Sequence, residues 1–220
     1  MKRMMRLPEP LYRAVKPQFA SHARWHEARQ PGELALRGPG TEFPSLLPLD
    51  RAGSGEQFLA YHREMFRTFL EIASSEPGAG FALDRWERFP AWLADIFAWT
   101  HPGFLPGALV RTAQLVRSGN ADELGHFLES TLVSADPYRG LHNLAHASIA
   151  LYEGQRYGAG HPRLYDAAMD SPATSPHNEH FWSLHAWIDG LYADVLRFSE
   201  LRGTEGNTPE SASSSRARDG

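Results

Sequence analysis

Residues 56–74 read EQFLAYHREMFRTFLEIAS, and this stretch decides the fold class. Its apolar side chains share the three- or four-residue spacing of one face of an α-helix. They are Phe58, Leu59, Met65, Phe66, Phe69 and Leu70. His62 falls on the same face. The stretch therefore predicts an amphipathic helix that carries a histidine on its apolar side.

Helical spacing continues along most of the chain, and no segment shows the sustained alternation of a β-strand. Gly154 and Gly203 are expected to end the helices that precede them. The sequence therefore predicts an all-α protein. The further helices are expected over residues 105–117, 121–132, 140–152 and 180–201, and from Pro90 to Thr100.

Glycine and proline mark two irregular segments, over residues 31–55 and 158–177, the second with a short helix near Leu164. From residue 204 onward the chain has almost no apolar side chain. A segment of that composition buries too little surface to fold. We therefore expect one helical domain over residues 1–203 and a disordered tail over residues 204–220.

The composition excludes several classes of protein. The 220 residues include no cysteine, which rules out disulfides, thiolate catalysis and cysteine-bound metals. The net charge of −4 disfavours nucleic-acid binding. No long apolar run predicts a membrane span, and Pro8 and Pro10 interrupt the region where a secretory signal would be apolar. A cytoplasmic protein is the simplest interpretation.

Histidine, in contrast, is abundant, with eleven residues. The segment LHNLAH at residues 141–146 places His142 and His146 four apart, so both imidazoles project from one helix face. Neutral imidazole binds Cu, Zn, Fe and Ni, so this pair could share one metal ion. The alternative is one core or capping histidine and one surface histidine.

A second segment, residues 175–189, reads SPHNEHFWSLHAWID. It resembles the motif SPxDPxFWxHHAxID, which carries the third ligand of one copper ion, CuB, in tyrosinases and related type 3 copper proteins. The segment LHNLAH resembles the HNxxH motif of the same family. The resemblance implies that His142, His146 and His185 bind one copper ion. It also implies a four-helix bundle core with additional short helices and long loops.

Two other residues of the second segment would support the ligands. Phe181 matches the phenylalanine that packs on a CuB histidine in the family. Asn178 stands where the family has Asp, and its side chain can still cap the helix that follows, because its oxygen can accept an early backbone N–H.

A third segment, FLAYHREMFRTFLE at residues 58–71, resembles the family motif FLPWHRxYLxxFE. The resemblance implies that His62 is a ligand of the other copper, CuA. Gly53 occupies the place of the preceding CuA ligand in bacterial members. His22 and His26 remain as candidates, because they are four apart and no histidine lies between His26 and His62. The alternative is that both lie on the surface and CuA is degenerate.

The resemblance implies a dinuclear copper oxidoreductase that uses O2 on a phenol, catechol or aminophenol, by o-hydroxylation or by oxidation to the quinone. A small phenolic substrate and a copper-loading partner are the expected partners. Asn143 matches the family residue that, with a glutamate, holds a water near the substrate. Glu129 is a candidate for that glutamate, although its spacing differs. The alternative function is an O2- or metal-binding relative with a degenerate CuA and no phenol oxidase activity.

The other histidines are expected at the surface or in loops, with His180 also considered as a neighbour of the ligands. A di-iron site is disfavoured, because such bundles use two Glu-x-x-His pairs and this chain has one, Glu123 with His126. These remaining histidines are His101, His126, His161, His177 and His180.

Overall fold

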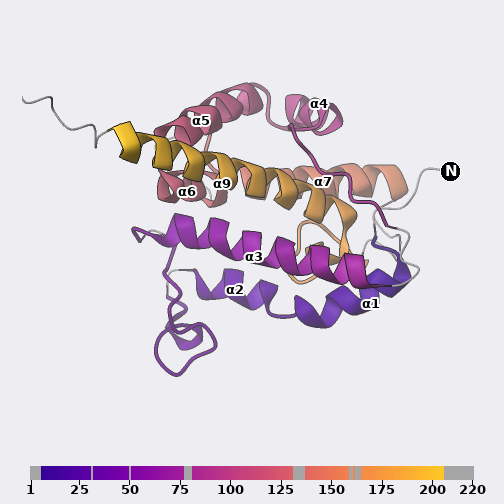
Figure 1. Cartoon of the computed structure of the whole chain (residues 1–220). Helices are drawn as coiled ribbons and strands as arrows, with labels where there is room; N and C mark the ends of the chain where they lie inside the picture. Colours follow the sequence, from indigo (N-terminus) through magenta and orange to yellow (C-terminus); the bar gives the residue numbers. More distant parts are fainter. Residues whose placement is uncertain are drawn as a thin grey trace, which may run out of the picture.

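The computed structural model confirms an all-α fold (Figure 1). It describes residues 6–30, 32–49, 51–76, 81–130, 137–158, 161 and 165–205. Within these ranges the α-helices are joined by loops and short 3-10 turns, and the only β-type pairings are isolated bridges. The helices are α1 (Glu9–Gln18), α2 (His22–Ala28), α3 (Ser54–Ser75), α4 (Ala91–Thr100), α5 (Phe104–Ser118), α6 (Ala121–Glu129), α7 (Leu141–Tyr157) and α9 (Glu179–Glu205). The 3-10 turns are η1 (Leu34–Leu36) and η2 (Ser175–His177).

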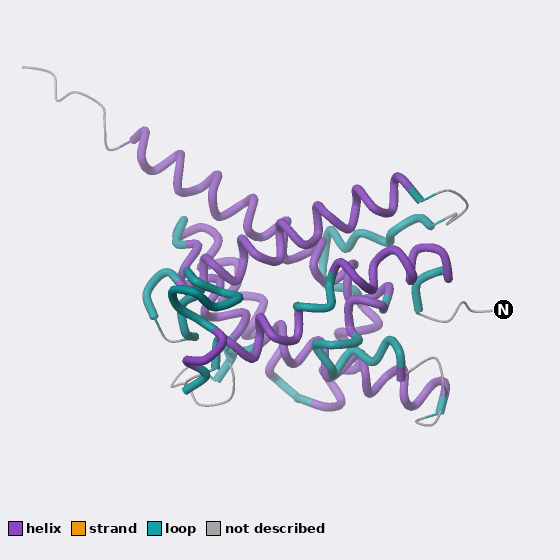
Figure 2. The backbone as a smooth tube through the Cα atoms, turned by 90° about the horizontal axis from the view of Figure 1, so that it is seen from below, coloured by secondary structure: helices purple, strands orange, loops and turns teal. Residues whose placement is uncertain are grey.

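Helices α3 and α9 form the centre of the molecule and pack against each other. Helix α6 packs closely on α3, and α5 packs on both α9 and α6. Helix α7 contacts α4 and α6, while α1 and α2 lie on the other side of α3 (Figure 1). Figure 2 shows that most of the described chain is helical, with loops joining the helices. The arrangement leaves the middle of α3 facing α2, α7 and α9.

Large aromatic side chains fill the core between these helices. Trp182 of α9 is fully buried and stacks on Phe69 of α3, with ring centroids 3.9 Å apart. Such offset aromatic pairs add to the free energy gained by burying their apolar area. Phe58, one turn before His62, is also fully buried. The predicted apolar face of residues 56–74 therefore forms the core face of α3.

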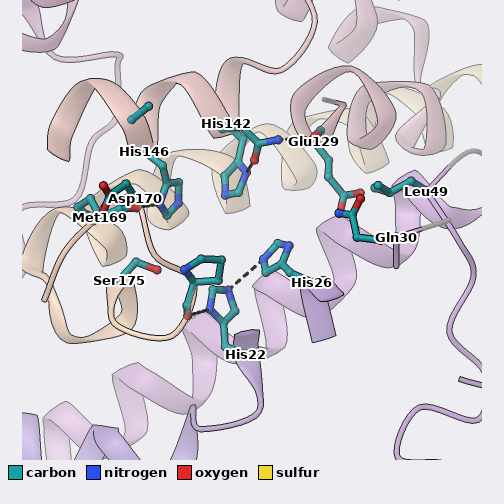
Figure 3. A pocket seen from close by; sticks show the side chains of 13 residues that line it. His22, His26, Gln30, Leu49, Glu129, His142, His146, Met169, Asp170 and Ser175 are labelled. Atoms are coloured by element: carbon teal, nitrogen blue, oxygen red, sulfur yellow. Dashed lines mark hydrogen bonds between the residues drawn. The ribbon is translucent and has the colours of Figure 1, made fainter. Parts of the chain in front are cut away.

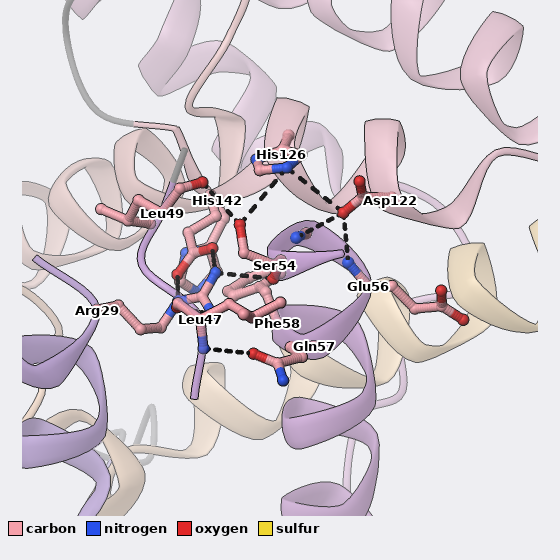
Figure 4. Close-up of polar contacts among 12 residues, drawn as sticks. Arg29, Leu47, Leu49, Ser54, Glu56, Gln57, Phe58, Asp122, His126 and His142 are labelled. Carbon is pink, nitrogen blue, oxygen red and sulfur yellow. Dashed lines mark hydrogen bonds and ion pairs between the residues drawn. The ribbon is translucent and has the colours of Figure 1, made fainter. Parts of the chain in front are cut away.

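The start of α3 is held against α6 by a close backbone approach. A Cβ atom on Gly55 or on Gly125 would overlap the backbone of the opposite helix, so only glycine fits at this crossing. The carboxylate of Asp122 accepts hydrogen bonds from the backbone N–H groups of Gly53, Gly55 and Glu56, at 2.8, 2.8 and 3.2 Å (Figure 4). These bonds satisfy donors that the first helical turn leaves free. They fix the position of α3 along α6, and with it the position of His62.

Several predicted helix ends were wrong. Gly154 lies inside α7, which continues to Tyr157, and Gly203 lies inside α9, which continues to Glu205. Residues 204 and 205 are thus helical instead of part of the tail. A glycine tolerates a helix interior at a modest cost, so tertiary packing can override it. Helix α6 ends at Glu129, three residues before the predicted end.

Some predictions fall on residues outside the described part of the chain. These are the short helix near Leu164, residues 131 and 132 at the predicted end of α6, and the tail from residue 206. Among the helices that are described, none is long and apolar enough to cross a membrane.

Candidate metal centre

The six histidines predicted as ligands converge between α2, α3, α7 and α9. Helix α2 provides His22 and His26, α3 provides His62, α7 provides His142 and His146, and α9 provides His185. Figure 3 shows the rings of His22, His26, His142 and His146 facing one pocket. His62 and His185 lie deeper, with stacked rings 4.8 Å apart, and each is nearly fully buried.

The three predicted CuA ligands form one close group. The ring centroids of His22 and His26 are 4.7 Å apart, and those of His22 and His62 and of His26 and His62 are 5.8 and 5.4 Å apart. One ring nitrogen from each histidine lies within 4.8 Å of the others. The Nε2 atoms of His22 and His26 face each other at 3.1 Å. His22 is therefore buried and His26 half-buried, and the rings of both point toward His62 instead of outward.

The predicted CuB ligands also contact one another. The ring centroids of His142 and His146 are 4.6 Å apart, and His185 lies 5.3 and 5.7 Å from them. The second close group of ring nitrogens in the described chain differs from the predicted set in one member, since it joins His62, His142 and His185 within 4.8 Å. His62 thus borders both groups, which places the two sets side by side.

Backbone and amide oxygens orient the rings. In five of the six histidines the Nδ1 atom lies within hydrogen-bond distance of an oxygen, which favours a proton on Nδ1 and leaves Nε2 unprotonated. These contacts are His22 to Pro172 O (2.6 Å), His62 to Phe58 O (2.8 Å), His142 to Asn143 Oδ1 (2.9 Å), His146 to Met169 O (2.7 Å) and His185 to Phe181 O (2.7 Å).

The free Nε2 atoms are buried. Those of His62, His142, His146 and His185 have no hydrogen-bond partner among the described residues. A buried polar atom without a partner costs about 1–3 kcal/mol, so four in one place need an explanation. A metal ion that accepts these lone pairs would explain them, because imidazole nitrogen is a common metal ligand. The residues therefore fit a bound metal.

The electrostatic environment keeps the imidazoles neutral. Burial lowers the pKa of His22 and of His146 to about 4. Burial, followed by repulsion from neighbouring histidines, holds the pKa of the other four well below the usual 6.5. Neutral imidazole is the form that binds metals, so protons compete weakly with a metal ion near pH 7.

Phe181 and Asn178 support the cluster as the sequence suggested they could. The Phe181 ring lies 4.0 Å from the His185 ring and 5.7 Å from the His146 ring, centroid to centroid. Asn178 Oδ1 accepts the backbone N–H of His180 at 2.9 Å, so this side chain caps α9. Its position fixes the turn from which His185 projects.

The structure also explains why an asparagine can serve at position 178. Asn178 Nδ2 donates to both carboxylate oxygens of the buried Glu153, at 2.9 and 3.0 Å, and to the carbonyl of Ala167 at 2.8 Å. An aspartate has no such donor and would place a second carboxylate beside the first. Burial raises the pKa of Glu153 to about 7.

Asn143 and Glu129 lie together at the pocket, but their polar groups have other partners. Asn143 Nδ2 donates to the backbone carbonyl of Glu129 at 2.7 Å, while Asn143 Oδ1 faces His142. The Glu129 carboxylate is held by Arg29, whose Nε lies 2.7 Å from Oε1 and whose Nη2 also contacts Oε2. Burial raises the pKa of Glu129 to about 7, and Arg29 opposes this shift. Sequence reasoning missed Arg29, which lies three residues after His26.

The histidines open into a pocket of about 280 Å³, near the lower end of small-molecule sites. Ala147 lies in its wall and is exposed, so the small side chain leaves the entrance open. The segment that follows α7 supplies Met169, Asp170 and Pro172 to the wall of the pocket. The Asp-Ser-Pro turn within residues 158–177 is the sequence signal that could have pointed to this wall.

The remaining histidines lie outside the cluster, although two of them are buried. His180 is only 8% exposed and packs between Trp86 and Trp92, with centroids 5.9 and 4.8 Å away, and burial lowers its pKa to about 4. His177 is 6% exposed, and its Nδ1 lies 2.8 Å from the Asp166 carbonyl. The expectation that both lie at the surface or in loops was therefore wrong about their burial. His101 follows α4 as its C-cap.

Comparison with known proteins returns no match to this chain among family models, curated proteins or solved structures. What the six histidines bind is therefore inferred from their geometry and from the sequence motifs.

Proposed function

We propose that this chain holds two copper ions between α2, α3, α7 and α9 and uses O2 to oxidise a small catechol, phenol or aminophenol. The observation that carries this proposal is the convergence of six neutral imidazoles, four of which have a buried Nε2 without a hydrogen-bond partner among the described residues. His22, His26 and His62 would hold one ion. His142, His146 and His185 would hold the other, with His62 and His185 side by side between them.

The donor set supports copper over some other metals. It contains six histidines, and no carboxylate joins either of the close groups found in the described chain. Hard cations such as Mg²⁺ and Ca²⁺ prefer oxygen ligands, and di-iron bundles use carboxylates with histidine. Imidazole alone suits copper, zinc and nickel. The resemblance of three sequence motifs to type 3 copper proteins favours copper among these.

Bound copper would supply the redox chemistry, and the chain's own residues would bind and orient the substrate. The pocket gives a small ring access to His22, His26, His142 and His146. Apolar atoms of Leu49, Met169 and Pro172 line its walls and can contact the faces of the ring.

Catechol or aminophenol oxidation is favoured over hydroxylation of a monophenol. A monophenol would need a group that accepts its hydroxyl proton at the site. The candidate Glu129 carboxylate is bound at both oxygens by Arg29, and Asn143 is bound at both ends of its amide. A water held by these two residues would have to share groups that already have hydrogen-bond partners, so the arrangement supports hydroxylation less directly than oxidation.

Metal content and oxidation assays test this function. We expect the purified chain, loaded under reducing conditions with Cu(I) and desalted, to retain two copper ions and to oxidise 4-methylcatechol in air. His26→Ala and His146→Ala, one from each set, should each lower the copper content to about one ion and abolish oxidation. His180→Leu is the matched control, because His180 is also buried with a free Nε2 but lies outside the cluster.

Two results would contradict the proposal in different ways. Fewer than two copper ions in the fully loaded wild type would exclude the dinuclear site and favour the relative with a degenerate CuA. Two copper ions without oxidation of any catechol or aminophenol would favour an O2- or metal-binding protein.

A further inference from the structure

The two ends of the pocket differ in charge. Figure 3 shows Glu129, Gln30 and Leu49 at one end and Asp170, Met169 and Ser175 at the other, with the histidines between them. Both charged residues that line the pocket are acidic, and no lysine or arginine among the described residues lines it. A ligand in the pocket would therefore meet a carboxylate at each end.

Within the described residues, one of these carboxylates has an ion-pair partner and the other has none. The Glu129 carboxylate is paired with Arg29, and both side chains are nearly fully buried. Asp170 is exposed at the pocket lip and forms no ion pair with any residue in the described ranges. Among the described residues, Asp170 is thus the pocket carboxylate that a cationic ligand can pair with.

A buried hydroxyl at the same end also lacks a partner. Ser175 is fully buried and lines the pocket, and its Oγ has no hydrogen-bond partner among the described residues. Figure 3 shows this hydroxyl on the pocket side of its loop. A hydroxyl can donate or accept a hydrogen bond, so a polar ligand group beside it would remove the cost of leaving it unpaired.

The position of Asp170 is fixed by the residues around it. Met169 and Pro172 offer their carbonyl oxygens to His146 and His22, at 2.7 and 2.6 Å. Asp170 lies between these two anchors along the chain, so its backbone is restrained at the pocket, and Figure 3 shows it beside His146. A charge that does not have to be ordered on binding contributes more to selectivity.

We propose that Asp170, with Ser175 beside it, selects substrates that carry an ammonium group, so that the natural substrate is a small aminoalkyl catechol or phenol. This inference rests on the proposed function. The aromatic ring would lie over the histidines and the ammonium group at the Asp170 end, where a carboxylate-bearing analogue would be repelled.

Three catechols of similar size test the proposal: dopamine, 3,4-dihydroxyphenylacetate and 4-methylcatechol, which are cationic, anionic and neutral. Their binding is measured calorimetrically on protein loaded with zinc, which is redox-inert, so the readout does not depend on turnover. We expect dopamine to bind about three- to fivefold more tightly than 4-methylcatechol, as for a partly exposed ion pair, and the anion to bind most weakly. The preference should decrease with added salt.

The variant Asp170→Asn should remove the preference for dopamine over 4-methylcatechol, measured as a ratio within each protein. Asp166→Asn is the matched control, because Asp166 is exposed in the same segment but does not line the pocket. A preference that survives in Asp170→Asn, or that is absent from the wild type, would overturn the inference. Loss of metal binding in Asp170→Asn would also overturn the inference, because Asp170 would then be a metal ligand.

The test of the Asp170 preference can fail without the oxidase function failing, and the reverse also holds. If copper-loaded wild type oxidises 4-methylcatechol but dopamine has no advantage, only the role of Asp170 fails. If no catechol is oxidised while zinc-loaded protein still prefers the cation, the oxidase function fails and the pocket is a cation-selective binding site.

Discussion

Arg29 and Glu129, one hundred residues apart in sequence, form an ion pair in which both side chains are almost completely removed from solvent. Arg29 follows α2, and Glu129 ends α6. The guanidinium also donates to the carbonyl of Ser54 at 2.8 Å (Figure 4). Asn143 Nδ2 donates to the backbone carbonyl of Glu129. The pair therefore joins the helix that carries His22 and His26 to the helices that carry the other histidines.

Breaking this pair should destabilise the metal-free protein strongly. Arg29→Met leaves the Glu129 carboxylate buried without its partner, which typically costs about 3–5 kcal/mol. Replacing both residues with methionine should recover part of that loss, because no buried charge then remains. Urea denaturation measures the free energy of unfolding.

The exposed pair between Arg24 and Glu42, at 3.0 Å, provides the comparison. Arg24→Met should cost less than about 1 kcal/mol, since solvent screens such pairs. Equal losses for Arg29→Met and Arg24→Met would contradict a role for burial.

Glu153 should make the protein less stable as the pH rises. Its pKa is raised from 4.5 to about 7 by burial, so the folded state favours the protonated form. A group of this kind stabilises fully below the unfolded pKa, and that contribution is lost as the pH rises through the folded pKa. The loss is on the order of 3 kcal/mol between pH 4.5 and above 7.

Glu153→Gln removes the titrating group and keeps an oxygen for Asn178. We expect this variant to be more stable than wild type at pH 8 and similar at pH 5, by urea denaturation. Glu153→Ala, which leaves Asn178 Nδ2 with fewer acceptors, should be less stable at both pH values. If wild type is more stable than Glu153→Gln at pH 8, then hydrogen bonds stabilise the charged carboxylate by more than burial destabilises it.

The buried histidines should make the protein less stable as the pH falls, whereas Glu153 makes it less stable as the pH rises. Their folded-state pKa values are lowered by burial, to about 4 for His22, His146 and His180. The stability they contribute is present above the unfolded value of 6.5 and is lost as the pH falls toward 4. His180→Leu removes one such group without altering the cluster. It should reduce the slope of unfolding free energy between pH 6.5 and 4.5 by up to about 1.4 kcal/mol per pH unit. An unchanged slope would mean that His180 is protonated in the folded state.

Two glycines on neighbouring helices should respond to alanine with opposite signs. In Gly125→Ala the new methyl group would overlap the backbone of Gly55, where neither helix can yield. The loss should reach about 3 kcal/mol or more. Gly154 in α7 has open space around its Cβ position, so Gly154→Ala should stabilise by about 0.5–1 kcal/mol through helix propensity. Thermal unfolding of the two variants distinguishes these outcomes, and destabilisation by Gly154→Ala would contradict the helical assignment there.

The period of apolar side chains predicted the fold class and the location of the long helices, because a buried helix face requires an apolar residue at every third or fourth position. It predicted helix ends less well. Gly154 and Gly203 looked like terminators, yet packing carries α7 and α9 past them. The neighbours of Glu153 and Arg29 were not predictable, since each pairs with a residue distant in sequence.

For the candidate site too, some residues could be predicted from the sequence and others could not. Spacing within one helix indicated that His142 and His146 share a face, and the motifs pointed to His62 and His185. Only the tertiary structure brings His26 within 5.4 Å of His62, centroid to centroid. The segment from Met169 to Ser175 has no regular spacing, and its Asp-Ser-Pro turn indicates a loop without indicating which helices the loop contacts.

That segment has a consequence for how metal ions enter. Because Met169 holds His146 and Pro172 holds His22, a single short stretch of chain restrains one histidine from each set. An ion that binds either set restricts the motion of this stretch. The second ion then binds a stretch that is already ordered, so its binding costs less conformational entropy. Uptake should then be positively cooperative, with half-filled molecules scarce during a metal titration.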